Sequence, residues 1–270
     1  MIQAVAFDLD DSLLRDDRSI SDYTVDVLRR VAAMGIHVIP ASGRVRESMR
    51  PYVDQIGCAS CYISGNGAEV YAPDHTLLMS RQLSPAMAKE AARFAIEHAC
   101  YAQSYEDGSF FYDRSGVWAD AYAASARLHG VKVDDLVEYI HLPTPKVLLI
   151  DSPERIAELL PLAQQRFSGR MTATCSKPIY MEITPPEANK GNALVWTAEY
   201  FGFQLEHVMA FGDSLNDMSM LTAVGCGVAM DNARSEVKSA MRFHCLSNEQ
   251  DGIARYLEQH ILNSDTQEGD

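Results

Sequence analysis

The sequence predicts an α/β fold, a doubly wound and mostly parallel sheet with an inserted α+β domain. Short apolar runs typical of buried strands alternate with segments whose apolar residues recur at helical spacing. Several of these runs end in acidic or hydroxyl residues, and ligands bind at the carboxyl ends of strands in such sheets. Between residues 83 and 185 the pattern changes to capped helices and short, partly aromatic strands. We therefore expect a core from residues 1–82 and 186–270, and an inserted domain from residues 83–185.

The composition is ordinary for a globular protein of 270 residues, which is enough for one large domain or two smaller ones. Lys and Arg number 23 and Asp and Glu number 37, which gives a formal charge of −14. An acidic chain repels nucleic acid and anionic membrane, so neither is an expected partner. No run approaches the ~18 apolar residues of a membrane span, and no signal peptide precedes the first strand, so we expect a cytoplasmic location.

The first apolar run, residues 2–7, predicts a buried strand that ends in two acidic residues. Asp8 and Asp10 are two positions apart, and on an extended chain such side chains point to the same side. Converging carboxylates repel each other unless a cation or a shared proton offsets the charge. Mg²⁺ fits because it prefers hard oxygen ligands and substrate phosphates. A polar strand end that opens a turn at Asp11 and Ser12 explains these residues equally well.

A second buried strand, residues 37–41, ends at Ser42, Gly43 and Arg44, where we expect a helix to begin. A hydroxyl and a glycine at a strand-to-helix junction form a natural phosphate seat, since backbone N–H groups and the helix dipole point at the ligand. A plain turn is the alternative for these three residues.

A third short strand, residues 61–63, is followed by Asn66 and Gly67, a pair that favours positive φ. We interpret Asn66 as a turn residue rather than as a polar group of the site. Cys58 and Cys61 have the CxxC spacing of redox and zinc sites, but no second pair lies nearby in the sequence. We expect reduced, partly buried cysteines.

The inserted domain is expected to contain two capped helices. Ser84 precedes Pro85 and Ser152 precedes Pro153, so each pair places an N-cap before a proline at the first helical position. Short strands are expected within residues 101–118 and at residues 146–151, 170–174 and 179–183, with a helix at residues 119–130. Two prolines at 185 and 186 close the domain and stiffen the linker.

The chain returns to the core with Asn189, Lys190 and Gly191, which open a helix that runs through Phe201. The helix dipole disfavours a lysine at this position, so an anionic ligand is one reason for it. A solvated surface lysine is the alternative.

The next strand, residues 207–211, runs into Asp213, Asn216 and Asp217 at a helix start. Side chains three and four positions apart converge on one side of a first helical turn. Helix capping is the alternative for these acidic residues. One more strand is expected at residues 225–230, a closing helix at residues 253–261 and a frayed end over residues 263–270.

Four strand-end or helix-start sites thus carry complementary chemistry, with carboxylates for Mg²⁺ and a hydroxyl, an ammonium and an amide for phosphate. Their order resembles the haloacid dehalogenase superfamily of phosphohydrolases, and more closely its Cof-type sugar-phosphate phosphatases, over nearly the whole chain. The matching segments are Asp8-Leu9-Asp10-Asp11-Ser12, Ser42-Gly43-Arg44, Asn189-Lys190-Gly191, residues 211–218 and residues 227–233. Serine at 12 and at 42 replaces the frequent threonine of the family and keeps the hydroxyl.

The resemblance implies an aspartyl-phosphate mechanism. Asp8 would attack phosphorus, and Asp10 would protonate the leaving alcohol and then activate water. Mg²⁺ would bridge Asp8, the backbone carbonyl of Asp10, Asp213 and the phosphate. Asp217 would bind the metal directly or support it from outside its ligand set.

The resemblance also implies which residues bind the substrate. The residues placed at the phosphate are Leu9, Ser42, Gly43, Arg44, Lys190 and Asn216. The insert would be a cap that closes over the site and excludes water. Tyr180 and Glu182 are candidates to contact a hydroxylated leaving group, with ordinary strand packing and surface charge as the alternative.

We therefore expect a Mg²⁺-dependent phosphatase whose partner is a small phosphate monoester: a sugar phosphate first, with pyridoxal phosphate and flavin mononucleotide also open. A phosphomutase or a disaccharide-phosphate phosphatase on the same scaffold is the alternative among enzymes. A phosphometabolite-binding regulator without turnover is the alternative outside them, although binding alone needs no nucleophile. We expect a monomer or a weak homodimer.

Overall fold

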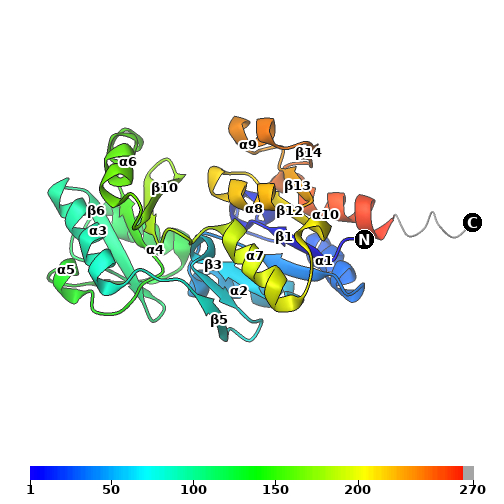
Figure 1. The fold of residues 1–270 in the computed structure, drawn as a ribbon, viewed down its shortest axis with the longest axis horizontal. Coiled ribbons are helices and arrows are strands. Elements are labelled where there is room, and N and C mark those ends of the chain that lie inside the picture. Colours follow the sequence, from blue (N-terminus) through cyan, green and yellow to red (C-terminus); the bar gives the residue numbers. More distant parts are fainter. Residues whose placement is uncertain (264–270) are drawn as a thin grey trace, which may run out of the picture.

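The computed structural model describes residues 1–263, which form two bodies that lie side by side in Figure 1. One body is the core, built from both ends of the chain, and the other is the inserted cap. The predicted α/β class is confirmed by the parallel sheet of the core. Of the end that was expected to be frayed, residues 264–270 lie outside the described part of the chain.

The core sheet has five parallel strands in the order β14-β13-β12-β1-β2. Its strands are β1 (Ala4–Phe7), β2 (His37–Pro40), β12 (Val208–Gly212), β13 (Cys226–Ala229) and β14 (Phe243–His244). Phe7 lies opposite Pro40 on one side and Phe211 on the other, so β1, β2 and β12 end at the same edge. Residues that follow β1, β2 and β12 therefore meet at this edge.

Helices cover the core sheet, and Figure 1 shows α7 and α8 in front of it. The core helices are α1 (Asp22–Ala33), α2 (Arg46–Ile56), α7 (Lys190–Phe201), α8 (Met218–Ala223), α9 (Ser235–Ala240) and α10 (Gly252–Leu257). A small antiparallel sheet, β3 (Tyr62–Ser64), β4 (Glu69–Tyr71) and β5 (Leu77–Ser80), extends the core through a parallel bridge between Ala41 and Ile63.

The second core helix begins later than the sequence predicts. α2 starts at Arg46 and not at the predicted junction of Ser42, Gly43 and Arg44. The loop between them is hydrogen-bonded to the chain after the third strand, because Ser42 N–H donates to Ile63 O at 2.9 Å and Gly65 N–H donates to Arg44 O at 2.8 Å. Backbone groups used in this way are not available to a helix.

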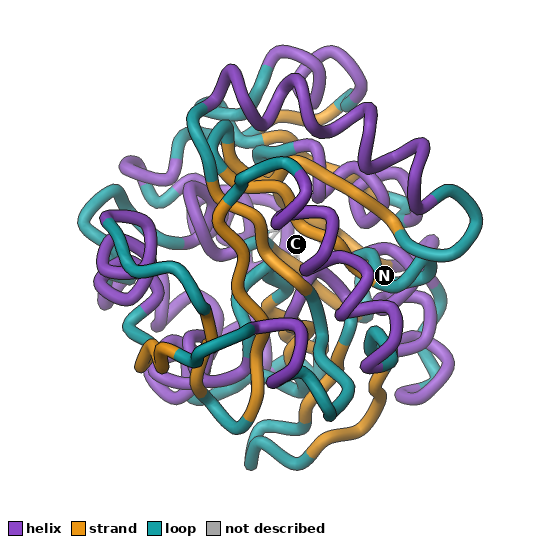
Figure 2. Tube along the Cα trace, turned by 90° about the vertical axis from the view of Figure 1, so that its left-hand side faces the viewer, coloured by secondary structure: helices purple, strands orange, loops and turns teal. Residues whose placement is uncertain are grey.

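The cap is built on a six-stranded sheet in the order β10-β11-β9-β6-β7-β8. Its strands are β6 (Tyr101–Glu106), β7 (Ser109–Tyr112), β8 (His129–Lys132), β9 (Val147–Ile150), β10 (Thr172–Lys177) and β11 (Tyr180–Thr184). Its helices are α3 (Pro85–Glu97), α4 (Val117–Ala126), α5 (Leu136–Tyr139) and α6 (Pro153–Phe167). Figure 2 looks onto this end of the molecule, where helices flank the strands.

Local sequence signals set most cap boundaries. Ser84 and Ser152 cap α3 and α6, as predicted, each accepting a hydrogen bond from the backbone N–H three residues later. The helix expected over residues 119–130 is wrong at its end, since α4 stops at Ala126. Arg127 takes the left-handed conformation there (φ 55°), and the chain then enters β8.

Each body has its own hydrophobic core, with Phe7 and Phe211 in the first and Phe94 and Phe167 in the second. The exact division at residues 83 and 185 stays a prediction, and the two large sheets lie on either side of it. Cys58 and Cys61 are free thiols, and Cys61 is buried. None of the helices in the described residues is long and apolar enough to cross a membrane.

Candidate active site

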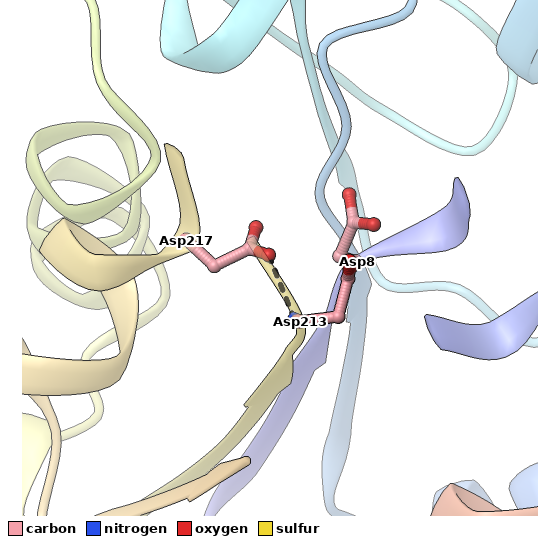
Figure 3. A group of neighbouring side chains, drawn as sticks. All are labelled: Asp8, Asp213 and Asp217. Atoms are coloured by element: carbon pink, nitrogen blue, oxygen red, sulfur yellow. Dashed lines mark hydrogen bonds between the residues drawn. The ribbon is translucent and has the colours of Figure 1, made fainter. Parts of the chain in front are cut away.

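Three carboxylates meet at the carboxyl edge of the core sheet. Asp8 follows β1, Asp213 follows the neighbouring β12, and Asp217 lies in the turn before α8. Their carboxylate oxygens lie within 4.8 Å of one another, and all three residues are buried. Figure 3 shows the side chains gathered above the strand ends. The parallel register of β1 and β12 thus joins residues more than two hundred positions apart.

The ammonium of Lys190 lies inside this group. Its Nζ donates to Asp8 Oδ1 and to Asp217 Oδ1, both at 2.5 Å, and its side chain is 0% exposed. Asn189 caps α7 by accepting a hydrogen bond from the Asn192 N–H, which makes Lys190 the first helical residue. The alternative of a solvated surface lysine is therefore excluded.

The group holds more negative charge than one ammonium offsets. Burial raises the pKa of Asp8 well above its usual value; Lys190 lowers it, and Asp217 and Asp213 raise it again. Burial and the charge of Asp217 raise the pKa of Asp213 to about 6. Buried carboxylates this close are stable as anions only beside further positive charge. Because all the donors are hard oxygens, the residues present fit a divalent cation such as Mg²⁺.

Asp217 also holds the loop that carries Asp213. Its Oδ2 accepts hydrogen bonds from the backbone N–H groups of Asp213 and Ser214, both at 3.0 Å (Figure 3 draws the first). A Cβ on Gly212 would lie 2.5 Å from the Cβ of Asp217, so only glycine fits at that position. Both carboxylate oxygens of Asp217 therefore have partners within the protein, Oδ1 with Lys190 and Oδ2 with the loop.

The chain does not stay extended after Asp8, so the predicted same-side geometry is wrong in detail. An irregular turn over Leu9–Leu13 follows, in which Asp10 is extended (φ −67°, ψ 125°) and Asp11 takes the left-handed conformation (φ 59°). The side chain of Leu9 packs into the hydrophobic core, which leaves only its backbone for the site. Asp8 and Asp10 nevertheless line the same cavity.

The carboxylate of Asp10 is paired with arginines and lies outside the three-carboxylate group. Arg44 donates from Nε to Oδ2 at 2.7 Å and from Nη2 to Oδ1 at 2.9 Å, and Arg18 donates to Oδ1 at 2.6 Å. Burial raises the pKa of Asp10, but the hydrogen bonds and charge of Arg44, followed by the charges of Lys177 and Arg18, lower it on balance. The guanidinium of Arg44 thus contacts the carboxylate of Asp10 directly.

A cavity of about 390 Å³ opens over these groups between the core and the cap. The residues predicted to bind phosphate or substrate that line it are Ser42, Gly43, Arg44, Asn216 and Glu182. Tyr180 lines it too. Lys190 is not one of the residues that line the cavity, but its Nζ donates a hydrogen bond to Asp8, which does line it.

Sequence reasoning missed several residues of this cavity. Lys146 and Lys177 line it from the cap. Asn66 has the predicted turn conformation (φ 55°), but its side chain also donates to Glu182 and accepts from Asn216 Nδ2. For Lys146 the sequence did contain a signal of a site residue, because it is a charged residue at the start of an apolar strand. For Asn66 it contained none, because the Asn-Gly pair is already explained by a turn.

The chain matches known proteins along nearly its whole length. The family of haloacid dehalogenase-like hydrolases matches residues 5–257. An HMP-PP phosphatase of Serratia proteamaculans is 30% identical over 98% of this chain and 97% of its own. An HMP-PP phosphatase of Yersinia pseudotuberculosis is 29% identical over 98% of this chain and 97% of its own.

Solved structures agree with the sequence relatives. A haloacid dehalogenase-like hydrolase from Bacteroides thetaiotaomicron aligns with a TM-score of 0.87 at 25% identity, covering 96% of this chain and 99% of that one. TM0651 from Thermotoga maritima aligns with a TM-score of 0.82 at 30% identity, covering 96% and 97%. With carboxylates and a lysine gathered at the sheet edge beneath an inserted cap, this chain belongs to the haloacid dehalogenase-like hydrolases and is a phosphatase of that family.

Proposed function

We propose that this phosphatase requires Mg²⁺ and hydrolyses small phosphate monoesters through an aspartyl-phosphate on Asp8. The observation that carries the proposal is the buried group of Asp8, Lys190, Asp213 and Asp217, placed beside a cavity that Asp10 also lines. Phosphoryl transfer needs mainly positioning and neutralisation of charge, and this group can supply both.

In this proposal Asp8, Asp213 and the backbone carbonyl of Asp10 would hold the Mg²⁺. Asp217 would support them from outside, because its Oδ2 accepts two backbone N–H hydrogen bonds and so fixes the loop that carries Asp213. When bound, the cation supplies positive charge that neutralises phosphoryl oxygens.

The protein's own residues would divide the reaction between two carboxylates. Lys190 donates to Asp8 Oδ1, and no hydrogen bond among the described residues reaches Oδ2, so Oδ2 is available to form the bond to phosphorus. For Asp10 to give a proton to the leaving alcohol oxygen as the ester P–O bond breaks, its carboxylate must first leave the arginines that lower its pKa here and take up a proton. Asp10 then takes a proton from water, whose oxygen attacks phosphorus and frees Asp8.

The phosphoryl oxygens would be held by the hydroxyl of Ser42, the amide of Asn216 and the ammonium of Lys190. Ser42 and Asn216 line the cavity from two different loops of the core. Such donors help most when they are already in place before the charge develops. Tyr180 lines the same cavity and would contact a sugar or heteroaromatic leaving group.

A second candidate is a substrate whose leaving group carries another negative charge. Lys177 and Arg234 line the cavity, and among the described residues no carboxylate pairs with Lys177. Arg234 pairs with Glu236 at 3.5 Å, and Glu236 is not part of the cavity lining. These two cations would offset a further anionic group, so HMP-PP, in the names of the relatives, belongs in the substrate panel beside sugar phosphates, pyridoxal phosphate and flavin mononucleotide.

The test is phosphate release across this panel, with Mg²⁺ and with chelator, and with Asp8→Asn as the control. We expect Mg²⁺-dependent release by the wild type and a kcat/KM of ~10⁴ M⁻¹s⁻¹ or more for the physiological substrate. An isomerised sugar phosphate in place of free phosphate would identify a phosphomutase. Tight binding without any turnover would identify a regulator.

We also propose that the enzyme acts in the cytoplasm, as a monomer or a weak homodimer, on a small molecule and not on nucleic acid or at a membrane. The formal charge of −14 supports the absence of nucleic acid and of anionic membrane as partners, because it repels polyanions. Sedimentation at micromolar concentration would measure the oligomeric state.

A further inference from the structure

A chain of buried polar side chains crosses from the cap to the core. Lys146 and Glu182 belong to the cap, and Asn66 and Asn216 belong to the core. Lys146 Nζ donates to Glu182 Oε1 at 2.7 Å, Asn66 Nδ2 donates to Glu182 Oε2, and Asn216 Nδ2 donates to Asn66 Oδ1 at 2.9 Å. Lys146, Glu182 and Asn66 are only 2%, 3% and 5% exposed. The steps proposed above for the reaction do not use these three residues.

Both ends of this series of hydrogen-bonded side chains reach residues that would bind phosphate. At one end Lys146 Nζ donates to the backbone carbonyl of Gly43 at 2.8 Å, which fixes the peptide next to Ser42. At the other end Asn66 holds one N–H of the Asn216 amide. A side-chain amide has two N–H donors, so the second remains for a phosphoryl oxygen, with its direction set by the first.

The two cap residues form their ion pair with each other, so the pair survives when the cap moves as a body. What cap movement would break is the bond from Lys146 to Gly43 and the bond from Asn66 to Glu182. A closed cap therefore fixes the phosphate-binding loops, and an open cap releases them. Closure would then complete the site as well as exclude water.

We propose that Lys146, Glu182 and Asn66 are positioning residues that couple cap closure to the phosphate site. The proposal rests on the proposed function and adds to it how the site is completed. In this role Glu182 acts through Lys146 and Asn66, each of which donates to one of its carboxylate oxygens. Asn66 suits the position because asparagine tolerates its left-handed backbone (φ 55°).

The experiment compares Lys146→Met, Glu182→Gln and the double variant with the wild type. Each single variant leaves one buried charge without its partner, which destabilises the fold, whereas removing both charges together is often close to neutral. The double variant is therefore the informative one, because its fold recovers while the links to Gly43 and Asn66 stay broken or weakened. Asn66→Gly removes the side chain that hydrogen-bonds both Glu182 and Asn216, and glycine keeps the positive φ.

The readouts are the melting temperature, the Kd for inorganic phosphate by calorimetry in the presence of MgCl₂, and the separate values of KM and kcat. We expect the double variant and Asn66→Gly to melt near the wild type but to bind phosphate about tenfold more weakly, as one or two lost hydrogen bonds to charged groups imply. KM should rise by a similar factor, with a smaller fall in kcat.

Glu90→Gln is the matched control, because Glu90 is a cap glutamate that accepts two hydrogen bonds from Arg170 and is not part of the cavity lining. It should leave the Kd for phosphate unchanged. A wild-type Kd in both the double variant and Asn66→Gly would overturn the proposal. No phosphate release by the wild type from any ester would instead overturn the proposed function, and the calorimetric comparison separates the two results.

Discussion

Replacing Lys190 by methionine tests whether a buried ammonium holds the carboxylates of the site together. Methionine keeps the length and most of the volume of the side chain and removes the charge. In the structure the ammonium lies 2.5 Å from oxygens of both Asp8 and Asp217, and none of these groups is more than 7% exposed. Without the ammonium, the buried carboxylates of Asp8 and Asp217 face each other and Asp213 with no cation between them.

Removing one partner of a buried ion pair costs about 3–5 kcal/mol. The free energy of unfolding of a typical domain is about 5–15 kcal/mol, so this is a large share of it. For a protein of this size each kcal/mol corresponds to roughly 2–4 °C in melting temperature, and we therefore expect a decrease of roughly 6–20 °C. Mg²⁺ should reduce the loss, because the cation offsets part of the same negative charge.

The assay is thermal unfolding of wild type and Lys190→Met in EDTA and in excess MgCl₂, followed by circular dichroism. Lys238→Met is the control, since the side chain of Lys238 is 37% exposed and pairs with Asp231 at the surface, where such pairs contribute little. A Lys190 variant that melts within ~2 °C of the wild type in EDTA would refute the electrostatic reasoning. An equal loss with and without Mg²⁺ would refute the idea that the cation and the ammonium neutralise the same carboxylates.

Three further predictions address the same site. Asp8→Asn should keep the fold by circular dichroism and lose at least ~10³-fold in kcat, and full activity would contradict its role as nucleophile. Gly212→Ala should lower both melting temperature and activity, because its Cβ would lie 2.5 Å from that of Asp217; a wild-type melting curve would show that the loop can shift at no cost. Mg²⁺ at a hundred times its Kd should add about 2.7 kcal/mol to wild-type stability, measured by thermal shift, and Asp213→Asn should lose most of that gain.

The sequence predicts the elements of the core because local signals and the fold agree there. The buried runs before Asp8 and Asp213 become β1 and β12, and parallel pairing then brings their ends together without further information. The start of α2 was not predictable, because Ser42 is held by a backbone hydrogen bond to Ile63, a residue of another strand. Local propensity contains nothing about such a bond.

The cap side of the site was largely hidden in the sequence for a similar reason. Lys146 stands at the head of an apolar strand, and only the folded chain brings its ammonium to the carbonyl of Gly43. Asn66 illustrates the limit from the other direction. Its Asn-Gly turn is fully explained by local conformation, so the pattern gives no reason to expect that the same side chain also links the two bodies.

The contacts of Arg44 form a second connection between the cap and the core, which ends at the carboxylate of Asp10. Arg44 binds both oxygens of Asp10 and also donates from Nη1 to Ser48 Oγ at 2.7 Å, and Ser48 Oγ donates to the carbonyl of Ala126 in the cap at 2.6 Å. The cap therefore reaches the phosphate seat through Lys146 and the acid through Ser48. If closure brings the groups at the ends of both routes into place, as proposed above, an open enzyme would lack the geometry for phosphoryl transfer even with substrate bound. Under the proposed coupling, premature transfer to bulk water would be disfavoured, because the closing of the cap would both complete the site and exclude solvent.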